Sequence, residues 1–537
     1  MHKRAVILFV LTLPVSAATC EDLKSLSLAD TTIDAAESVA AGAFKPAAAA
    51  NAKQAPPNFS DLPAFCRVAA TIKPTEDSDI KIEVWMPAKD WNGKLEGNGN
   101  GGWTGSITPA TLASGLRRNY ATAMTDTGHE GGSGSFALGH PEKLIDFAYR
   151  STHVMTVAAK QIVTAFYGRA PGLSYFNGCS AGGKQGLAEA QLFPTDYQGI
   201  ISGAAANNWT HMMAQIVWVA QAVHKDEASF IPANKLPQLH DSAVAACDAR
   251  DGVKDGVIDD PTKCKFDPKV IECKGKDTPA CLTSAQVEAA RKIYSPLRNP
   301  RSKQEIYPGF EPGSELGWSQ FVAGPTPTTF ATDEFKFVVF KNPDWDYKTM
   351  NFDGDVALAD IADGKINNAT DPNLKTFFEH GGKLIQYHGW NDQLIAPMNS
   401  VNYFLSVEKA MAEEGKAAEA EKAEPPRFEN DKGGKAAKER TAPPPPVALA
   451  NVANSYRLFM APGMNHCQGG DGPSTFDMLT ALEQWVESGA APDRIVASHM
   501  ANGQVDRTRP LCPYPQVAVY NGKGSTDDAQ NFTCRVR

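Results

Sequence analysis

The sequence lacks several features that mark other classes of protein. It contains no long block of Lys and Arg, and its formal net charge is -9 over 537 residues, so we expect neither a nucleic-acid footprint nor a polybasic membrane patch. It contains no C-x-x-C pair, which removes the common zinc and redox motifs. It contains no internal repeats. Small molecules are therefore the expected partners, and the sequence leaves the oligomeric state open.

Long apolar runs are also missing after the first residues. The chain begins with His2, Lys3 and Arg4, continues through an apolar run over 5–15, and reaches the small residues Ser16 to Ala18. This pattern predicts a signal peptide over 1–18, with a buried first helix as the alternative. No later run reaches about eighteen apolar residues. We expect a secreted or periplasmic protein without a membrane anchor once the signal peptide is cleaved.

The chain has ten cysteines, an even number that in an exported protein favours disulfides over free thiols. They are Cys20, Cys66, Cys179, Cys247, Cys264, Cys273, Cys281, Cys467, Cys512 and Cys534. Spacing suggests local pairs for 247 with 264, 273 with 281, and 512 with 534. A Cys20–Cys66 bond would tie down residues 19–66, which are rich in Ala, Pro and Asn and are expected to be irregular.

The order of the expected strands and helices predicts an α/β fold with a mostly parallel sheet. Strands are expected at 81–88, at 94–105 running into a Gly-rich loop, and at 119–128, followed by a helix over 142–166. This order is typical of a mostly parallel α/β sheet. We assign the core to 67–206 and 376–537, and a large inserted lid domain to 207–375. An Ala/Glu/Lys-rich insertion at 407–449 predicts a solvated helix and a disordered loop.

A serine, an aspartate and a histidine occupy the positions of a hydrolase triad. Ser180 lies in "NGCSAGG", a G-x-S-x-G turn, while Asp392 in "YHGWND" and His466 in "GMNHC" each follow an expected strand. Their order is that of α/β-hydrolases, in which a base takes the serine proton and a carboxylate orients the base. His388 competes as the base and Asp196 as the carboxylate. We expect His388 to be structural, and Asp196 to support a turn.

The cysteines beside the triad suggest a clamp. Cys179 precedes Ser180 and Cys467 follows His466, so a disulfide between them would hold the serine and histidine loops together within hydrogen-bond reach. The alternative is that Cys179 itself is the nucleophile, but a sulfur in a disulfide is no thiolate.

"GCSAGGKQG", "YHGWND" and "GMNHC" together resemble the tannase and feruloyl esterase family, which includes mono(2-hydroxyethyl) terephthalate hydrolase. The resemblance extends over nearly all of the chain after the signal peptide, the lid and the inferred disulfides included. It implies an α/β-hydrolase with Ser180, Asp392 and His466 as the triad and a Cys179–Cys467 bond. The loop between Asp392 and His466 is longer than this family leads one to expect.

Two backbone groups are candidates for the oxyanion hole. The first is the N–H of Ala181, the residue after the serine. The second lies in "GNGNGGWTG" at 97–105, which resembles the family's other donor loop, so that Gly101 or Gly102 is expected to donate. The alternative interpretation of this stretch is a flexible turn.

An acidic loop, "CDARDGVKDGVIDDPTKC" at 247–264, sets aspartates among glycines. An acidic turn would explain the composition, but Ca2+ takes six to eight oxygen ligands on such tightly turning backbone. The family resemblance implies a structural calcium site in the lid. Its ligands would be the carboxylates of Asp248, Asp251 and Asp255 and the carbonyls of Val253 and Val257.

The resemblance implies a serine carboxylic ester hydrolase acting on aromatic esters such as hydroxycinnamates or gallates. Terephthalate monoester hydrolysis, a serine peptidase, and a non-catalytic calcium-stabilised binding protein on the same fold are the alternatives. The sequence does not separate these acyl groups. The lid contributes aromatic residues that could form either core or pocket: Trp318, Phe330, Phe335, Phe337, Phe340 and Trp345.

Overall fold

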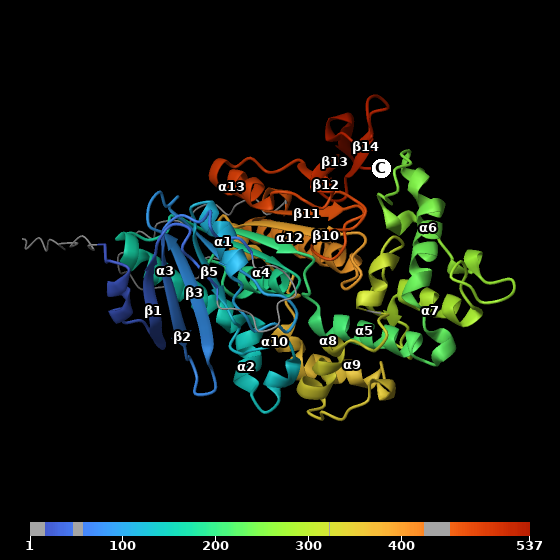
Figure 1. The fold of residues 1–537 in the computed structure, drawn as a ribbon, viewed down its shortest axis with the longest axis horizontal. Helices are drawn as coiled ribbons and strands as arrows, with labels where there is room; N and C mark the ends of the chain where they lie inside the picture. Colours follow the sequence, from blue (N-terminus) through green and yellow to red (C-terminus); the bar gives the residue numbers. More distant parts are fainter. Residues whose placement is uncertain (1–16, 47–56, 322, 424–451) are drawn as a thin grey trace, which may run out of the picture.

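The structure, a computed structural model, describes residues 17–46, 57–321, 323–423 and 452–537 (Figure 1). Nearly all of the predicted signal peptide and the insertion beyond residue 423 lie outside these ranges. Within the described ranges, no helix has the length and apolar character needed to cross a membrane.

A nine-stranded sheet forms the centre of the fold, in the order β1-β2-β3-β5-β4-β6-β7-β10-β11. The strands from β5 to β11 in this order pair in parallel, whereas β1, β2, β3 and β5 pair antiparallel. The bounds are β1 Thr31–Val39, β2 Phe65–Ile72, β3 Ile80–Pro87, β4 Lys94–Asn98, β5 Ala121–Thr125, β6 Leu173–Cys179, β7 Gly199–Gly203, β10 Lys383–Gly389 and β11 Tyr456–Ala461. The expectation of an α/β fold with a mostly parallel sheet is confirmed.

Part of the stretch 19–66 is not irregular as expected, because Thr31–Val39 forms an edge strand. All nine residues of β1, "TTIDAAESV", pair with or lie beside β2. Only Ile33 of this strand is buried, so the alternation that indicates a half-buried strand is too weak to read from the sequence. The predicted Cys20–Cys66 bond is present and ties the segment before β1 to β2.

Helices cover both faces of the sheet (Figure 1). One face carries α3 Ser151–Tyr167, α4 Ala181–Leu192 and α12 Met398–Ala423, and the other carries α1 Pro109–Arg117 and α13 Met478–Ser488. Such two-sided cover explains why β5 and β7 are buried at every residue. In α12, Val407 and Met411 are fully buried, so the first turns of the expected solvated helix pack against the core.

The chain between β7 and β10 leaves the sheet and forms the green and yellow part of Figure 1. It contains α5 Trp209–Val223, α6 Leu236–Cys247, α7 Ser284–Tyr294, α8 Thr329–Asp333, α9 Gly354–Ala359, α10 Lys365–Asn367, α11 Lys375–Glu379 and the paired strands β8 Leu297–Arg298 and β9 Glu305–Tyr307. Its hydrophobic core also takes in Trp103 and Ala181 from the sheet side. The lid therefore packs directly against the loops that carry the expected site.

The C-terminal residues form two antiparallel hairpins outside the central sheet. The first joins β12 Ile495–Ala501 to β13 Gln504–Leu511, and the second joins β14 Val517–Tyr520 to β15 Phe532–Arg535. The helix α2 Pro141–Ile145 leads into α3 through one π-helical turn, Asp146–Arg150. All five disulfides inferred from the sequence are present.

Candidate active site

Ser180 forms a strained turn between β6 and α4. Its backbone has φ 65° and ψ -124°, a region that non-glycine residues seldom adopt and that concentrates at functional sites. The turn is fixed by three backbone hydrogen bonds: Ser180 donates to the carbonyl of Gly203 at 2.9 Å, and its own carbonyl accepts from Lys184 and Ala206, each at 3.1 Å. The surrounding structure thus holds the serine in a costly conformation.

The glycines around Ser180 are required by close packing. A Cβ at Gly178 would lie 2.4 Å from the carbonyl oxygen of Gly182, and one at Gly182 would lie 2.9 Å from that of Asn100. Neither space admits a side chain without backbone movement. The G-x-S-x-G pattern therefore reflects the approach of the Gly-rich loop and the sheet to the start of α4.

Asp392 follows β10 and is a buried carboxylate with several donors. Its Oδ1 accepts from the backbone N–H of Leu394 and Ile395, each at 2.8 Å, and its Oδ2 accepts from His466 Nδ1 at 2.7 Å. Burial by itself would raise the pKa of Asp392, but the charge of His466 and hydrogen bonds from two imidazoles lower it well below its ordinary value. Asp392 is consequently ionised at any pH near neutrality.

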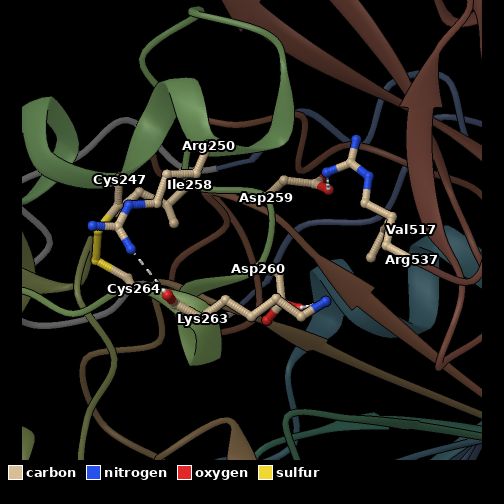
Figure 2. A pocket seen from close by; sticks show the side chains of 9 residues that line it. All are labelled: Cys247, Arg250, Ile258, Asp259, Asp260, Lys263, Cys264, Val517 and Arg537. Carbon is tan, nitrogen blue, oxygen red and sulfur yellow. Dashed lines mark hydrogen bonds and ion pairs between the residues drawn. A yellow bond between two sulfur atoms is a disulfide. The ribbon is translucent and has the colours of Figure 1, made fainter.

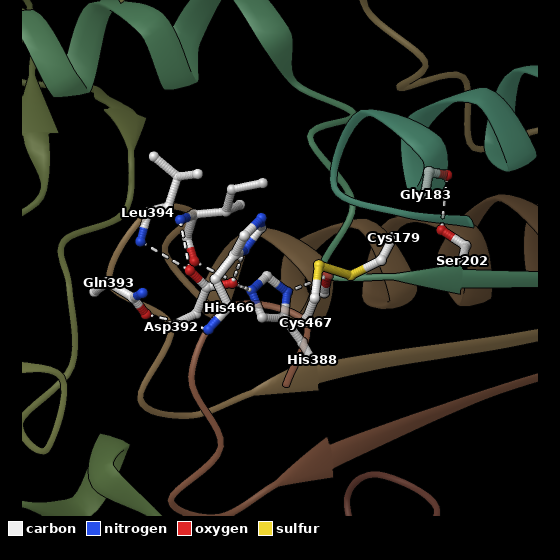
Figure 3. The surroundings of a disulfide bond; sticks show 11 residues. Cys179, Gly183, Ser202, His388, Asp392, Gln393, Leu394, His466 and Cys467 are labelled. Atoms are coloured by element: carbon white, nitrogen blue, oxygen red, sulfur yellow. Dashed lines mark hydrogen bonds and ion pairs between the residues drawn. A yellow bond between two sulfur atoms is a disulfide. The ribbon is translucent and has the colours of Figure 1, made fainter. Parts of the chain in front are cut away.

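His466 follows β11 in a loop and lies against Asp392 (Figure 3). Its backbone N–H also donates to Gln393 Oε1 at 3.1 Å. Because Nδ1 donates to Asp392, Nε2 carries the lone pair, which is the tautomer that a general base needs.

His388 supports Asp392 from within β10. Its Nε2 lies 3.0 Å from Asp392 Oδ2 and 3.1 Å from the carbonyl of Ile395, so that nitrogen is the donor, and Nδ1 accepts from the Ser400 hydroxyl at 2.7 Å. The ring is fully buried and both nitrogens are engaged, which agrees with the structural role expected for it. Asp196, the competing carboxylate, pairs with His153 at 2.6 Å instead of His466.

The Cys179–Cys467 disulfide joins the end of β6 to the loop of His466 (Figure 3). The two Cα atoms lie 6.1 Å apart across a sequence separation of 288 residues. Since consecutive Cα atoms lie about 3.8 Å apart, the Cα atoms of Ser180 and His466 are within about 14 Å of each other. Cys179 is bonded and so is no free thiol, which removes the alternative nucleophile.

The Gly-rich loop after β4 is fastened to α4. The backbone N–H of Asn100 donates to Gln185 Oε1 at 2.9 Å, and Asn100 Nδ2 donates to the carbonyls of Ser106 and Thr125. Gly101 lies in open space with no atom within 4 Å of a Cβ built on it. The loop approaches the first turn of α4, whose N–H groups lack partners within the helix, because a Cβ at Gly182 would lie 2.9 Å from the carbonyl oxygen of Asn100.

A buried histidine, His129, also anchors the Gly-rich loop. His129 Nε2 donates to the carbonyl of Trp103 at 2.8 Å, while Nδ1 accepts from Thr127. Burial lowers the pKa of His129, so the ring is neutral and this tautomer persists. The Gly-rich stretch is therefore an anchored loop, rather than the flexible turn that was the alternative.

Among the lid aromatics, Phe330 lies beside this loop. Its ring is 3.6 Å from the Cβ position of Gly102, and its carbonyl accepts from Trp103 Nε1 at 2.9 Å. Trp318 and Phe335 are instead fully buried in the lid core. The sequence did not distinguish these roles because all are aromatic residues in one segment.

A buried charge cluster joins α4 to the lid and was missed in the sequence. Lys184 Nζ donates to Asn367 Oδ1 at 2.6 Å and lies 4.9 Å from the centre of the Trp209 ring. Asn367 Nδ2 donates to both oxygens of Asp363, at 2.8 and 3.0 Å. Glu334 Oε2 accepts from Trp209 Nε1 at 3.1 Å. The one signal in the sequence is a lysine among the small residues of "AGGKQG".

Burial decides the protonation of this cluster. It lowers the pKa of Lys184 to about 7, raises that of Asp363 to about 6, and raises that of Glu334 well above its ordinary value. Glu334 therefore keeps its proton and can donate it to Asp363. Between about pH 6 and pH 7 the cluster then holds one ammonium, one carboxylate and one neutral acid.

The acidic loop curls around Asp248, which is 4% exposed. Its two oxygens accept from the backbone N–H groups of Asp255 and Gly256, each at 3.1 Å. Asp255 Oδ2 pairs with Arg509, and Arg507 lies 3.8 Å from the same oxygen. Gly252 and Gly256 have φ of 92° and 81°, which allows the tight turns.

Carboxylate and carbonyl oxygens are the ligand type that Ca2+ takes; in this structure both Asp248 oxygens accept backbone N–H groups and Asp255 pairs with Arg509. The side chain of Asp251 lies outside the described residues. Figure 2 views the loop beside the Cys247–Cys264 disulfide and a cavity of about 170 Å³, where Asp259 faces Arg537 at 3.5 Å. The arginines offset part of the loop's negative charge.

We predict that the double variant Cys179→Ala/Cys467→Ala lowers kcat toward a small ester by about 100-fold, because a displacement near 1 Å between reacting groups has that cost. Cys512→Ala/Cys534→Ala is the matched control, expected to lower the free energy of unfolding by about 2–4 kcal/mol while leaving kcat within about twofold. Steady-state kinetics below the Tm of both variants provides the test. Equal losses of kcat in the two variants would contradict a clamp that acts on geometry.

We predict that Lys184→Met lowers the free energy of unfolding by about 3–5 kcal/mol, because it leaves Asp363 buried without its counter-charge. Glu334→Gln replaces a neutral acid by a neutral amide of the same shape, so it should cost less than about 1 kcal/mol. Thermal unfolding followed by circular dichroism measures both. A loss in Glu334→Gln as large as that in Lys184→Met would mean that Glu334 is ionised.

Comparison with known proteins identifies the family of this chain. The sequence profile described as "Tannase and feruloyl esterase" matches residues 66–535. An uncharacterized esterase of Xanthomonas campestris pv. campestris is 38% identical, with 98% of this chain and 92% of the relative aligned. A protein of Aspergillus fumigatus named "Probable feruloyl esterase B-2" is 33% identical over 88% of this chain and 86% of its own length.

Solved structures give the same result for the fold. Feruloyl esterase B from Aspergillus oryzae superposes with a TM-score of 0.83 at 28% identity, over 96% of this chain and 99% of that one. Tannin acyl hydrolase from Aspergillus niger superposes with a TM-score of 0.74 at 22% identity, over 96% and 93% of the two chains, and so indicates the fold alone. With its profile match over most of the length and its relatives above 30% identity, this chain belongs to the tannase and feruloyl esterase family.

Proposed function

We propose that this esterase is a secreted serine carboxylic ester hydrolase that acts on aromatic esters, with hydroxycinnamate and gallate esters as the first candidates. The observation that carries the proposal is the Asp392–His466 hydrogen bond of 2.7 Å, tied by the Cys179–Cys467 disulfide to the strained turn of Ser180. A buried, ionised aspartate and a correctly protonated histidine are what an acyl transfer by serine needs.

The reaction follows from the roles of these groups. Ser180 Oγ would attack the ester carbonyl carbon while His466 Nε2 takes the hydroxyl proton, and the same nitrogen would return it to the departing alcohol. Asp392 holds the imidazole and stabilises its charged form. Water would then attack the acyl-enzyme with His466 again as base, which releases the acid and restores Ser180.

The tetrahedral intermediate requires donors for its oxyanion, each worth about 3–4 kcal/mol in comparable enzymes. We assign these to the backbone N–H of Ala181 and to that of Gly101 or Gly102. Packing of the Gly-rich loop onto α4 supports this assignment, because an anchored donor does not have to reorganise during the reaction. The N-terminal end of the α4 dipole adds favourable potential for a negative charge.

Aromatic acyl groups are favoured by the position of Phe330. Its ring lies beside Gly102, so an acyl group whose carbonyl reaches this loop meets an aromatic surface from the lid. A terephthalate monoester is the second candidate, and its free carboxylate would need a cationic partner.

We also propose that the acidic loop binds Ca2+ as a structural ion. Asp248, Asp251 and Asp255 would supply carboxylates, and Val253 and Val257 would supply carbonyl oxygens. The ion would stabilise the contact between the lid loop and the C-terminal hairpin that carries Arg507 and Arg509, and it takes no part in the chemistry.

The function is tested by hydrolysis of methyl ferulate, methyl gallate and mono(2-hydroxyethyl) terephthalate by the purified mature protein and by Ser180→Ala. Loss of the nucleophile should lower kcat by about 10⁶-fold. Ser202→Ala, which removes a hydroxyl that donates to the carbonyl of Gly183, is the control and should retain turnover. A feruloyl amide in the same assay tests the peptidase alternative.

Turnover that survives in Ser180→Ala would refute the triad. Failure of all three esters would favour a non-catalytic binding protein or a different acyl group. A burst of alcohol release equal to the enzyme concentration would report the acyl-enzyme directly.

The calcium proposal predicts one bound Ca2+ per chain by elemental analysis and a lower Tm in excess EGTA, because an ion that binds only the folded state stabilises it. Asp248→Asn should lose the ion. Asp226→Asn, at an exposed lid aspartate that caps a short helix, should keep it, since asparagine caps equally well. If the protein contained no metal, or if both variants contained equal metal, the loop would be an acidic turn that binds no ion.

A further inference from the structure

A second group of ligand-type side chains lies on the helical face of the sheet, apart from both the proposed triad and the acidic loop. It consists of His153 on α3, Glu189 on α4 and Asp196 after α4. One nitrogen or oxygen from each residue lies within 4.8 Å of those from the others. In the described part of the chain, the other such group includes Cys273 and Cys281, whose sulfurs form a disulfide and offer no thiolate.

Glu189 is the unusual member of this group. Glu189 is 1% exposed and no donor group reaches its carboxylate oxygens, so the Asp196 carboxyl group is the neighbour with which it can share a hydrogen bond. Burial, followed by the negative charge of Asp196, raises the pKa of Glu189 well above its ordinary value. A buried carboxyl group without partners costs free energy, and either a proton shared with Asp196 or a bound cation would offset that cost.

The other two residues are held in place around Glu189. His153 Nδ1 lies 2.6 Å from Asp196 Oδ2, and the His153 ring stacks on Phe193 with ring centres 3.8 Å apart. Lys160 is the cation beside this group: its Nζ donates to the backbone carbonyl of Asp196 and lies 3.9 Å from Asp196 Oδ1. The histidine side chain is 31% exposed, which leaves a route from solvent.

We propose that His153, Glu189 and Asp196 bind a divalent transition metal ion of the Zn2+ type. One imidazole nitrogen with two carboxylates is a donor set that zinc accepts, whereas Ca2+ and Mg2+ prefer oxygen ligands alone. Ligand atoms about 2.1 Å from a tetrahedral ion lie about 3.4 Å apart. Separations of up to 4.8 Å therefore need a contraction of at most about 1.4 Å, and water can complete the coordination.

Binding of the ion is coupled to the release of a proton. The ion replaces the proton of the buried Glu189 carboxyl group, and the His153 proton moves from Nδ1 to Nε2 so that Nδ1 can coordinate. One proton per ion is released to solvent wherever Glu189 is protonated, so affinity rises with pH over that range. The ion would join α3 to the end of the helix that begins after Ser180, without touching the reacting atoms.

The test uses tag-free mature protein in excess Ca2+, so that the acidic loop cannot be the zinc site. Titration calorimetry with ZnCl2, in two buffers of different ionisation enthalpy, should give one ion bound and about one proton released. Glu189→Gln and His153→Ala should each weaken binding by about tenfold or more. The control is His499→Ala, because His499 pairs with Asp506 at 2.7 Å but belongs to no group of three ligands in the described structure.

A second measurement separates binding from misfolding. Glu189→Gln replaces an unpartnered acid by a neutral amide, so its Tm without zinc should equal or exceed that of the parent protein, while the rise in Tm that zinc produces in the parent should disappear. Absence of saturable zinc binding by the parent protein would overturn the proposal. Equal affinity in the parent, Glu189→Gln and His153→Ala would overturn it as well.

Discussion

The Cys179–Cys467 disulfide is the constraint on which the geometry of the proposed site depends. Ser180 and His466 belong to loops that follow different strands and are nearly 290 residues apart in sequence, so loop-closure entropy opposes their meeting in the unfolded chain. A covalent bond between their neighbours removes that cost once folding has formed it. It also resists small shifts between the serine and histidine loops, to which acyl transfer is sensitive.

Buried carboxyl groups near the site reach low free energy in two different ways. Asp392 remains ionised because two backbone amides and two imidazoles donate to it, and this outweighs desolvation. Glu334 has one donor, the Trp209 indole, and keeps its proton. The number of donors that the fold directs at each group decides the outcome, which is why Asp392 serves as a charge and Glu334 as a neutral acid within the lid.

The lid contacts the segments on both sides of the proposed site's serine turn, the Gly-rich loop and α4. Phe330 supports the Gly-rich loop through the Trp103 indole, while Asp363 and Asn367 balance the charge of Lys184 on the helix that follows Ser180. The lid therefore shares both a hydrophobic core and a polar network with the sheet domain. Substitutions in the lid can be expected to alter the position of the serine turn through these contacts.

The sequence by itself determined the local features of this protein. The G-x-S-x-G turn, the strand periods, the even number of cysteines and their spacing specify short-range geometry, and from them the α/β fold, the five disulfides and the family could be predicted. Four things required the tertiary structure: the edge strand β1, whose alternation is weak; the support that His388 and His129 give; the Lys184–Asp363–Glu334 cluster; and the approach of His153 to Glu189 and Asp196. The physical reason is that burial and donor count depend on segments far apart in the chain, and a residue's own neighbours in sequence carry no information about them.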